Sequence, residues 1–250
     1  MFLGVKISFL GTNGWFDNTI GNTTCILLQT KKVNIIFDAG NGIYKLDKYI
    51  KNRNPIYLFL SHFHLDHIIG LHLLAKFNFP QGMIIIIPPQ TKIFLKRIIT
   101  YHYTMPFRRL KFPVKVKELS EKCSLPFKIK GYKLNHSSVC WGYRLEIEKK
   151  IIAYGADTGV CSNLYKLAKK ADVFIAECSY PPNKICEKWP HLNPEIAAKV
   201  AKEAGAKKLF LTHFDAHLYS TKKQRKIAEK WAKKIFPSSY ASYDNMVIII

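Results

Sequence analysis

The segment of residues 57–70, YLFLSHFHLDHIIG, is the stretch from which the fold and the chemistry of the chain can be predicted. An apolar run typical of a buried strand ends at Leu60, and three histidines and one aspartate follow within the next seven positions: His62, His64, Asp66 and His67. Side chains alternate along an extended segment, so His62 and His64 are expected to point to the same side. Imidazole nitrogens and a carboxylate in this density suit zinc, and the buried strand before them argues against a cluster of solvated surface residues.

One such cluster does not complete a catalytic site, so further ligands are expected at the ends of other strands. Three residues have this position: His136 in LNHSS, Asp157 in GADTG and His213 in LTHF. A lone histidine after a strand is more often a surface or hydrogen-bonded residue. The three share a place just past the carboxyl end of an apolar strand, however, where site residues of layered α/β proteins gather.

Short β-branched runs alternate with helical patterns along the chain. The expected strands are 5–10, 23–29, 33–38, 56–60, 83–88, 126–134, 139–147, 151–156, 172–177, 208–212 and 246–250. The expected helices are 42–51, 68–76, 91–100, 162–170, 194–204 and 222–235. Two strand-rich stretches closed by helices predict an α/β fold, a four-layer αββα sandwich. Because no Gly, Pro or Ser linker separates the halves, we predict a single domain over residues 1–250.

The composition is strongly basic, with 39 Lys and Arg against 17 Asp and Glu and a formal net charge of +22. Such a field attracts polyanions and indicates a phosphate-bearing substrate, with nucleic acid as one candidate. A lysine-rich solvated surface is the alternative. The stretch 94–117 is basic, aromatic and apolar together. It is interpreted either as a lid that grips an anionic substrate or as an ordinary connection with a basic face.

Six cysteines are scattered without a CxxC pair, so reduced thiols are expected: Cys25, Cys123, Cys140, Cys161, Cys178 and Cys186. The first residues, MFLGVKISFLGTNG, lack a basic leader region and are expected to begin the first strand. No apolar run of about 18 residues predicts a membrane span. These features together favour a cytoplasmic protein without membrane contact.

The order of these motifs resembles the metallo-β-lactamase superfamily. HxHxDH, a separate histidine, an aspartate in a DTG turn and a late THF histidine follow one another as in that family. The resemblance implies one metal ion bound by His62, His64 and His136, and a second bound by Asp66, His67 and His213. It also implies that Asp157 bridges both ions. Asp38, in IIFDAG, matches an early aspartate that supports the ligand loop.

Within the superfamily, the stretch 176–214 resembles the ribonuclease Z-like and phosphodiesterase branch. His191 matches an additional histidine of that branch, which implies a contact to phosphate or protonation of the leaving oxygen, with Glu177 as its orienting partner. Ribonuclease Z proper carries a long tRNA-gripping arm between the ligands matched by His136 and Asp157, whereas this chain has only a short connection there. The compact spacing is closer to that of small cyclic phosphodiesterases.

The resemblance implies a hydrolase with two divalent ions, for which Zn²⁺, Mn²⁺ and Fe all suit the ligands. Asp66 is expected both to bind metal and to hold the proton of the nucleophile. The first hypothesis is a phosphodiesterase acting on RNA, DNA or a small cyclic phosphate. The second is a hydrolase of thioesters, lactones or other carboxylic esters, and the third is a non-catalytic metal or nucleic-acid binder. The sequence leaves open whether the chain forms a homodimer.

Overall fold

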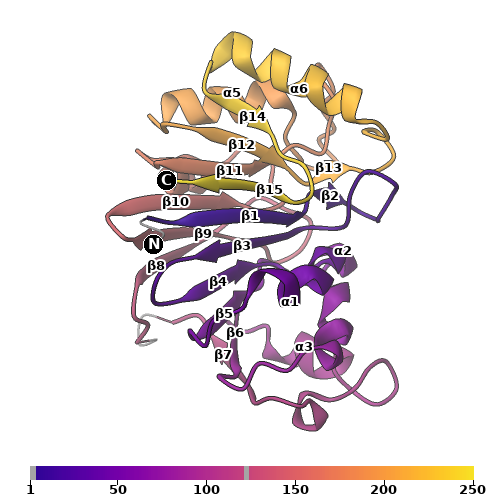
Figure 1. Cartoon of the computed structure of the whole chain (residues 1–250). Helices are drawn as coiled ribbons and strands as arrows, with labels where there is room; N and C mark the ends of the chain where they lie inside the picture. The colour runs from indigo at the N-terminus through magenta and orange to yellow at the C-terminus, as the bar shows by residue number, and fades with distance from the viewer. Residues whose placement is uncertain (1–3, 121–123) are drawn as a thin grey trace.

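The computed structural model describes residues 4–120 and 124–250, and two β-sheets lie face to face within them. Helices cover the outer faces of both sheets (Figure 1), which confirms the predicted αββα sandwich. Cys123 lies outside the described residues; the other five cysteines are free thiols. None of the helices in residues 4–120 and 124–250 is long and apolar enough to cross a membrane.

The first sheet has seven strands in the order β15-β1-β3-β4-β5-β6-β7. Their bounds are β1 (Lys6–Gly11), β3 (Cys25–Gln29), β4 (Asn34–Phe37), β5 (Ile56–Phe59), β6 (Met83–Ile87), β7 (Val114–Glu118) and β15 (Met246–Ile249). Strands β4 to β7 run parallel, while β1 pairs antiparallel with both β3 and β15. The carboxyl ends of the parallel strands therefore meet at one edge of the sheet.

The second sheet has six strands in the order β14-β12-β11-β10-β9-β8. Their bounds are β8 (Lys128–Lys133), β9 (Trp141–Ile147), β10 (Lys150–Gly155), β11 (Val173–Glu177), β12 (Leu209–Thr212) and β14 (Ser239–Ala241). Strands β10, β11, β12 and β14 are parallel. A short pair, β2 (Asn13–Gly14) with β13 (Phe214–Asp215), links the two halves at the edge where the parallel strands end.

The helices differ in regularity. The α-helices are α1 (Leu46–Tyr49), α2 (Leu65–Ile68), α3 (Lys92–Ile98), α4 (Ser162–Ala168), α5 (Pro194–Glu203) and α6 (Lys222–Ile235). The 3-10 helices are η1 (Asn41–Lys45), η2 (Ile69–Lys76) and η3 (Phe107–Arg109). Helix α5 begins as predicted, with the Asn193 side chain accepting a hydrogen bond from the Ile196 amide at 2.9 Å and Pro194 in the first turn.

Two of the predicted helices are 3-10 helices over much of their length. The segment 42–51 is η1 followed by a single α-turn, and 68–76 is mostly η2 after α2. Gly70 donates its amide to the Ala39 carbonyl at 2.8 Å, and a Cβ at Gly70 would collide with the Gly40 carbonyl. The chain is therefore tied to a neighbouring loop by its main chain, and the tighter 3-10 turns accommodate that close approach.

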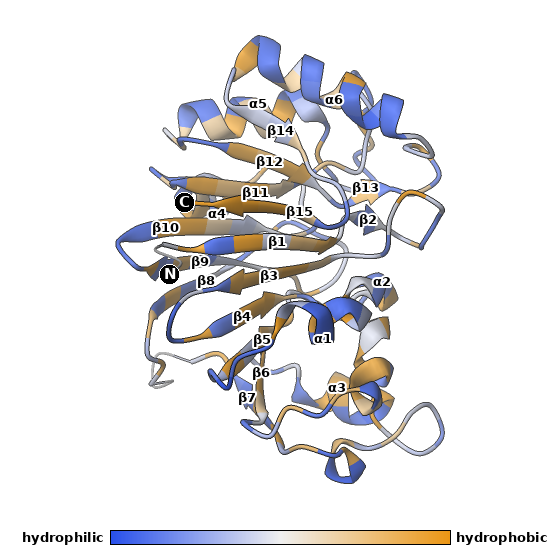
Figure 2. Ribbon diagram, viewed as in Figure 1, coloured by the Kyte–Doolittle hydropathy of each residue, from blue (hydrophilic) through white to orange (hydrophobic). Residues whose placement is uncertain are grey.

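Aromatic side chains form the core between the two sheets. Phe37 of β4 stacks on Tyr154 of β10 with ring centroids 5.0 Å apart, and on Tyr143 of β9 at 5.9 Å. The preceding residue, Ile36, points to the opposite face of the sheet, where it packs with Leu58 beneath the helices. Figure 2 shows hydrophobic residues along the central strands and hydrophilic ones along α6. Strands buried on both faces explain the continuous apolar runs in the sequence.

Candidate metal centre

Six polar side chains gather where the parallel strands of both sheets end. Asp38 follows β4, while His62 and His64 follow β5. On the opposite sheet, Asp157 follows β10 and His213 follows β12; His136 lies between β8 and β9. His62, Asp157 and His213 are buried, so the cluster is formed by the fold and not by flexible surface chains. Carboxyl ends of parallel strands are the usual place for such residues.

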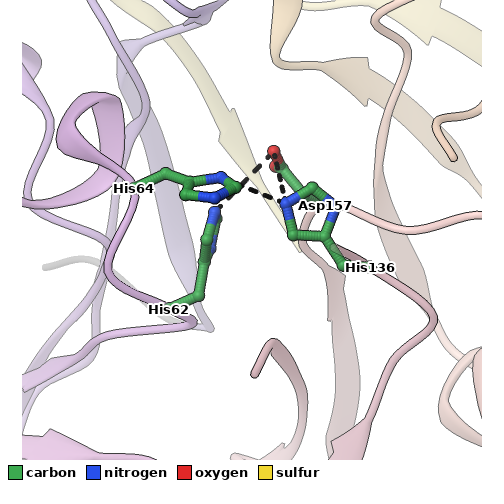
Figure 3. A group of neighbouring side chains, drawn as sticks. All are labelled: His62, His64, His136 and Asp157. Carbon is green, nitrogen blue, oxygen red and sulfur yellow. Dashed lines mark hydrogen bonds and ion pairs between the residues drawn. The ribbon is translucent and has the colours of Figure 1, made fainter. Parts of the chain in front are cut away.

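The first group consists of His62, His64, His136 and Asp157, whose ligand atoms lie within 4.8 Å of one another. Figure 3 shows the two histidines of the β5 loop facing the two residues from the second sheet. His64 Nδ1 lies 3.1 Å from His136 Nε2, and Asp157 Oδ2 lies 3.9 Å from Nε2 of both His62 and His136. The extended backbone places His62 and His64 on one side, as predicted.

The second group consists of Asp66, His67 and His213. Asp66 and His67 lie in the first turn of α2, and their side chains reach the loop after β12. His213 Nε2 lies 3.0 Å from His67 Nε2 and 3.1 Å from Asp66 Oδ2. Asp157 joins this group through its other oxygen, Oδ1, which is 3.2 Å from Nε2 of both histidines. Asp157 therefore lies between the two groups.

Asp38 fixes the orientation of two imidazoles without entering either group. Its Oδ2 lies 2.8 Å from His67 Nδ1 and accepts hydrogen bonds from the hydroxyls of Ser61 at 2.8 Å and Tyr154 at 2.6 Å. Because the Ser61 hydroxyl donates to Asp38, its oxygen accepts from His62 Nδ1 at 2.9 Å. Both imidazoles thus carry their proton on Nδ1 and turn the lone pair of Nε2 toward Asp157.

The same argument applies to His213. The Ser179 hydroxyl donates to the His213 carbonyl oxygen at 3.1 Å and accepts from His213 Nδ1 at 3.0 Å. When both imidazoles are neutral, as metal binding requires, the Nε2 lone pairs of His67 and His213 face each other at 3.0 Å, an arrangement that a cation stabilises. His62 Nε2 and Asp157 Oδ1 are buried without a hydrogen-bond partner. This donor set fits divalent metal ions, whose ligands must be neutral imidazoles and ionised carboxylates.

The charge balance of the two groups also fits bound cations. Burial lowers the pKa of His62 well below its usual value and that of His136 to about 4, so both imidazoles are neutral at pH 7. Burial acts against charge on His67 as well, yet the carboxylates of Asp157, Asp66 and Asp38 raise its pKa well above the usual range. The surplus of carboxylate charge therefore stabilises positive charge at the centre of the second group.

His191 and Glu177 form a buried pair beside the second group. His191 Nδ1 lies 2.8 Å from Glu177 Oε1. Glu177 also accepts hydrogen bonds from the main-chain amides of Thr158, Ser179 and Leu192, so it organises the loops that carry Asp157 and His191. Burial lowers the pKa of His191, but the Glu177 carboxylate outweighs it and raises the pKa to about 9.

A cavity of about 780 Å³ opens from this centre to solvent. It is lined by candidate ligands, including His64, Asp66 and His213, by His191, and by side chains that the sequence analysis did not single out: Trp15, Leu65, Ser179, Tyr180, Lys184 and Trp189. A second cavity, which His64 also lines, includes His136, Phe63, Phe94 and Lys133. The positions at strand ends predict most of the candidate ligands, but Trp15 and Trp189 lie on loops and carry no comparable signal.

The fold and this centre together define a metal-dependent hydrolase. The family model described as the beta-lactamase superfamily domain matches residues 33–214, so the chain belongs to this superfamily. Ribonuclease Z from Ligilactobacillus salivarius (strain UCC118) is 28% identical over 302 aligned residues, which cover 94% of this chain and 93% of that protein. The alignment is longer than the 250 residues of this chain, so that relative carries segments without a counterpart here.

Two solved structures show the same fold over nearly their whole length. The crystal structure of the metallo-beta-lactamase fold protein YhfI from Bacillus subtilis has a TM-score of 0.81 and 22% identity, and the match covers 98% of this chain and 99% of that one. Human tRNase Z, short form, has a TM-score of 0.74 and 22% identity with the same coverage. These likenesses confirm the metallo-β-lactamase fold that the motif order implied.

Proposed function

We propose that the protein is a metal-dependent phosphodiesterase with two divalent ions. One ion is assigned to His62, His64 and His136, the other to Asp66, His67 and His213, with Asp157 as the shared ligand. The observation that carries the proposal is the convergence of the Nε2 atoms of His67 and His213, 3.0 Å apart, on Asp157 Oδ1 at 3.2 Å. Imidazole and carboxylate ligands favour Zn²⁺, and Mn²⁺ and Fe remain candidates.

When bound, the ions supply Lewis acidity and an activated water nucleophile. The protein positions the substrate and carries out the proton transfers. Asp66, which accepts the Trp15 amide at 2.7 Å, has one carboxylate oxygen near His213 and is assigned the proton of the nucleophile. His191 is assigned the protonation of the leaving oxygen, because its raised pKa keeps it charged at neutral pH. Glu177 positions His191 and touches no reacting atom.

The charge distribution supports a nucleic-acid substrate. The net charge of +22 favours association with a polyanion, and the ribonuclease Z relative acts as a precedent for this fold on RNA. The stretch 94–117 begins at the second cavity, where the ring centroids of Phe94 and Phe63 are 5.8 Å apart. Further along, the Arg108 guanidinium lies 5.5 Å from the centre of the exposed Tyr101 ring. We assign this stretch to binding of the substrate body.

The predicted single domain over residues 1–250 and the cytoplasmic location are part of the proposal. The connection between His136 and Asp157 contains the hairpin of β9 and β10 and no arm. The proposed function therefore does not include recognition of tRNA through an arm between His136 and Asp157. The stretch 94–117, on the first sheet, is instead the candidate for contacts distant from the scissile bond.

Hydrolysis of bis-p-nitrophenyl phosphate tests the proposal. We expect turnover that requires added Zn²⁺ or Mn²⁺ and is abolished in His62→Ala. His72→Ala is the matched control, because His72 is exposed on η2 and lines neither cavity. A panel of thioesters and lactones is measured in parallel. Activity on that panel without phosphodiester hydrolysis would show the second class of hydrolase, and metal binding without either activity would show a binding protein.

A further inference from the structure

Two tryptophans are exposed at the mouth of the cavity that contains the candidate ligands. Trp15 is 67% exposed and Trp189 is 50% exposed, although both line the same cavity as His64, Asp66 and His213. Indoles are large apolar groups that folding normally buries, so two of them beside a metal centre require an explanation. They come from different loops, one before β3 and one before α5.

Trp189 is positioned against the first ligand group. Its ring lies nearly parallel to that of His64, with an interplanar angle of 9° and centroids 6.1 Å apart, and its centroid is 6.2 Å from that of His136. The Trp189 carbonyl accepts a hydrogen bond from the Tyr180 hydroxyl at 2.8 Å. The loop therefore holds the indole by its main chain, and the side chain itself is free to contact a ligand.

Trp15 is positioned against the second ligand group. Its amide donates to Asp66 Oδ2 at 2.7 Å, and a Cβ on the preceding Gly14 would collide with the His213 ring. Trp15 itself has φ of 73°, a left-handed conformation that bulky residues rarely adopt. Strain of this kind persists where the surrounding structure enforces it, and it is concentrated at functional sites. The contact with Asp66 enforces it here and places the indole at the cavity mouth.

We propose that Trp15 and Trp189 form a subsite for the nucleobases next to the scissile phosphate. The inference rests on the proposed phosphodiesterase function and specifies its substrate as a nucleotide ester. The metal groups place the phosphate, and a flat base joined to it through a sugar can stack on an indole at the cavity mouth. Lys184, which lines the same cavity, supplies positive charge for a neighbouring phosphate. A sugar phosphate without a base would leave both indoles uncovered.

Binding of two probes that differ only in the base tests the subsite independently of catalysis. Adenosine 5′-monophosphate and ribose 5-phosphate are titrated into the zinc-loaded protein, and affinity is followed calorimetrically. We expect the nucleotide to bind at least about 10-fold more tightly than the sugar phosphate. Trp189→Ala and Trp15→Ala should each reduce that advantage, while Trp189→Phe should preserve most of it. The matched control is Trp231→Ala, since Trp231 is on α6 and lines neither cavity.

Equal affinity for the two probes in the wild-type protein would overturn the subsite. An equal loss of affinity for both probes in Trp189→Ala would do so too, because it would show a structural role of the indole. Failure of the proposed function would give a different result: the protein would bind the nucleotide more tightly than the sugar phosphate but would hydrolyse no phosphodiester. Comparing hydrolysis of adenylyl-adenosine with that of adenosine 3′,5′-cyclic phosphate then distinguishes an RNA strand from a cyclic nucleotide as the source of the base.

Discussion

Glu177 and His191 form a buried pair in which Oε1 and Nδ1 are 2.8 Å apart. The carboxylate overcomes the effect of burial and raises the pKa of His191 to about 9. If the charged imidazole protonates the leaving oxygen, activity is full below this pKa and is lost as the pH rises through about 9. In Glu177→Gln the effect of burial is opposed only by the carboxylates of Asp157 and Asp66, so the pKa of His191 falls and the alkaline limb moves to lower pH.

The measurement is kcat for a phosphodiester against pH in the wild type and in Glu177→Gln. Glu195→Gln serves as control, because Glu195 accepts only the Asn183 amide among the bonds described and lies at the start of α5. Its profile should follow that of the wild type. Superimposable profiles for Glu177→Gln and the wild type would refute the role of the pair.

Asp157→Asn should remove the ligand that both groups share. The carboxylate contacts Nε2 of histidines in both groups, so we expect the zinc content per chain to fall and the activity to fall by ~100-fold or more. Zinc is measured by elemental analysis after gel filtration. Asp172→Asn is the matched control, because Asp172 pairs with Lys207 on the surface. Full zinc content in Asp157→Asn would contradict the assignment.

Asp38→Asn should weaken metal binding without removing a ligand. Asp38 orients His67 directly and His62 through Ser61, and changes of this kind typically reduce metal affinity or activity about 10–100-fold. Tyr154→Phe removes only one donor to the same oxygen and should have a smaller effect. Zinc affinity is determined by competition with a chelating dye. Wild-type affinity in Asp38→Asn would show that the hydrogen bonds do not position the imidazoles.

Removing metal should destabilise the fold. A ligand that binds only the folded state stabilises that state, and zinc at 100 times its Kd adds about 2.7 kcal/mol to the free energy of unfolding. For a domain of this size we expect the Tm to rise by about 5–10 °C on addition of zinc to the chelated protein. Calorimetry of His213→Ala should show a smaller rise, and an equal rise would place the stabilising zinc elsewhere.

Binding of RNA should depend on salt and on the stretch 94–117. The double variant Arg108→Ala/Arg109→Ala should reduce the slope of log K against log salt by about 1–2, since each lost phosphate contact contributes about one. Fluorescence anisotropy of a labelled single strand measures this slope. Lys149→Ala/Lys150→Ala is the charge-matched control, because these residues line a different cavity from the candidate ligands. Identical slopes for both double variants would exclude the stretch as the binding surface.

The long buried strands could be predicted from the sequence, but the edge strand β7 and the short strand β14 could not. β7 was not predicted, because its side chains alternate between half-buried and exposed at the edge of the sheet. β14 has only three residues and gives no periodic signal. By contrast, α6 has the predicted bounds, because a capping box of Thr221 and Gln224 marks its start.

Most candidate ligands were predictable because they follow buried strands, and strand ends of both sheets meet at one edge; His136 follows the half-exposed edge strand β8. The residues that orient them were not. Ser61 and Ser179 are hydroxyls in ordinary loop sequences, and their role depends on which carbonyl or carboxylate lies opposite. Trp15 approaches Asp66 only through the folded chain, from a loop far away in sequence. Contacts through space of this kind have no counterpart in a local pattern.

The pairing of β15 with β1, which joins Ile249 to Lys6, has a consequence for synthesis on the ribosome. Contacts between positions so distant in sequence form late and slow the folding of a chain. Strand β1 can pair with β3 early, but its other edge stays open until residues 246–249 have emerged. An open, apolar edge is prone to pair with other nascent chains. All seven candidate ligands are synthesised by then, so closure of this edge is a late step. Shielding of the open edge by chaperones should matter most before that step.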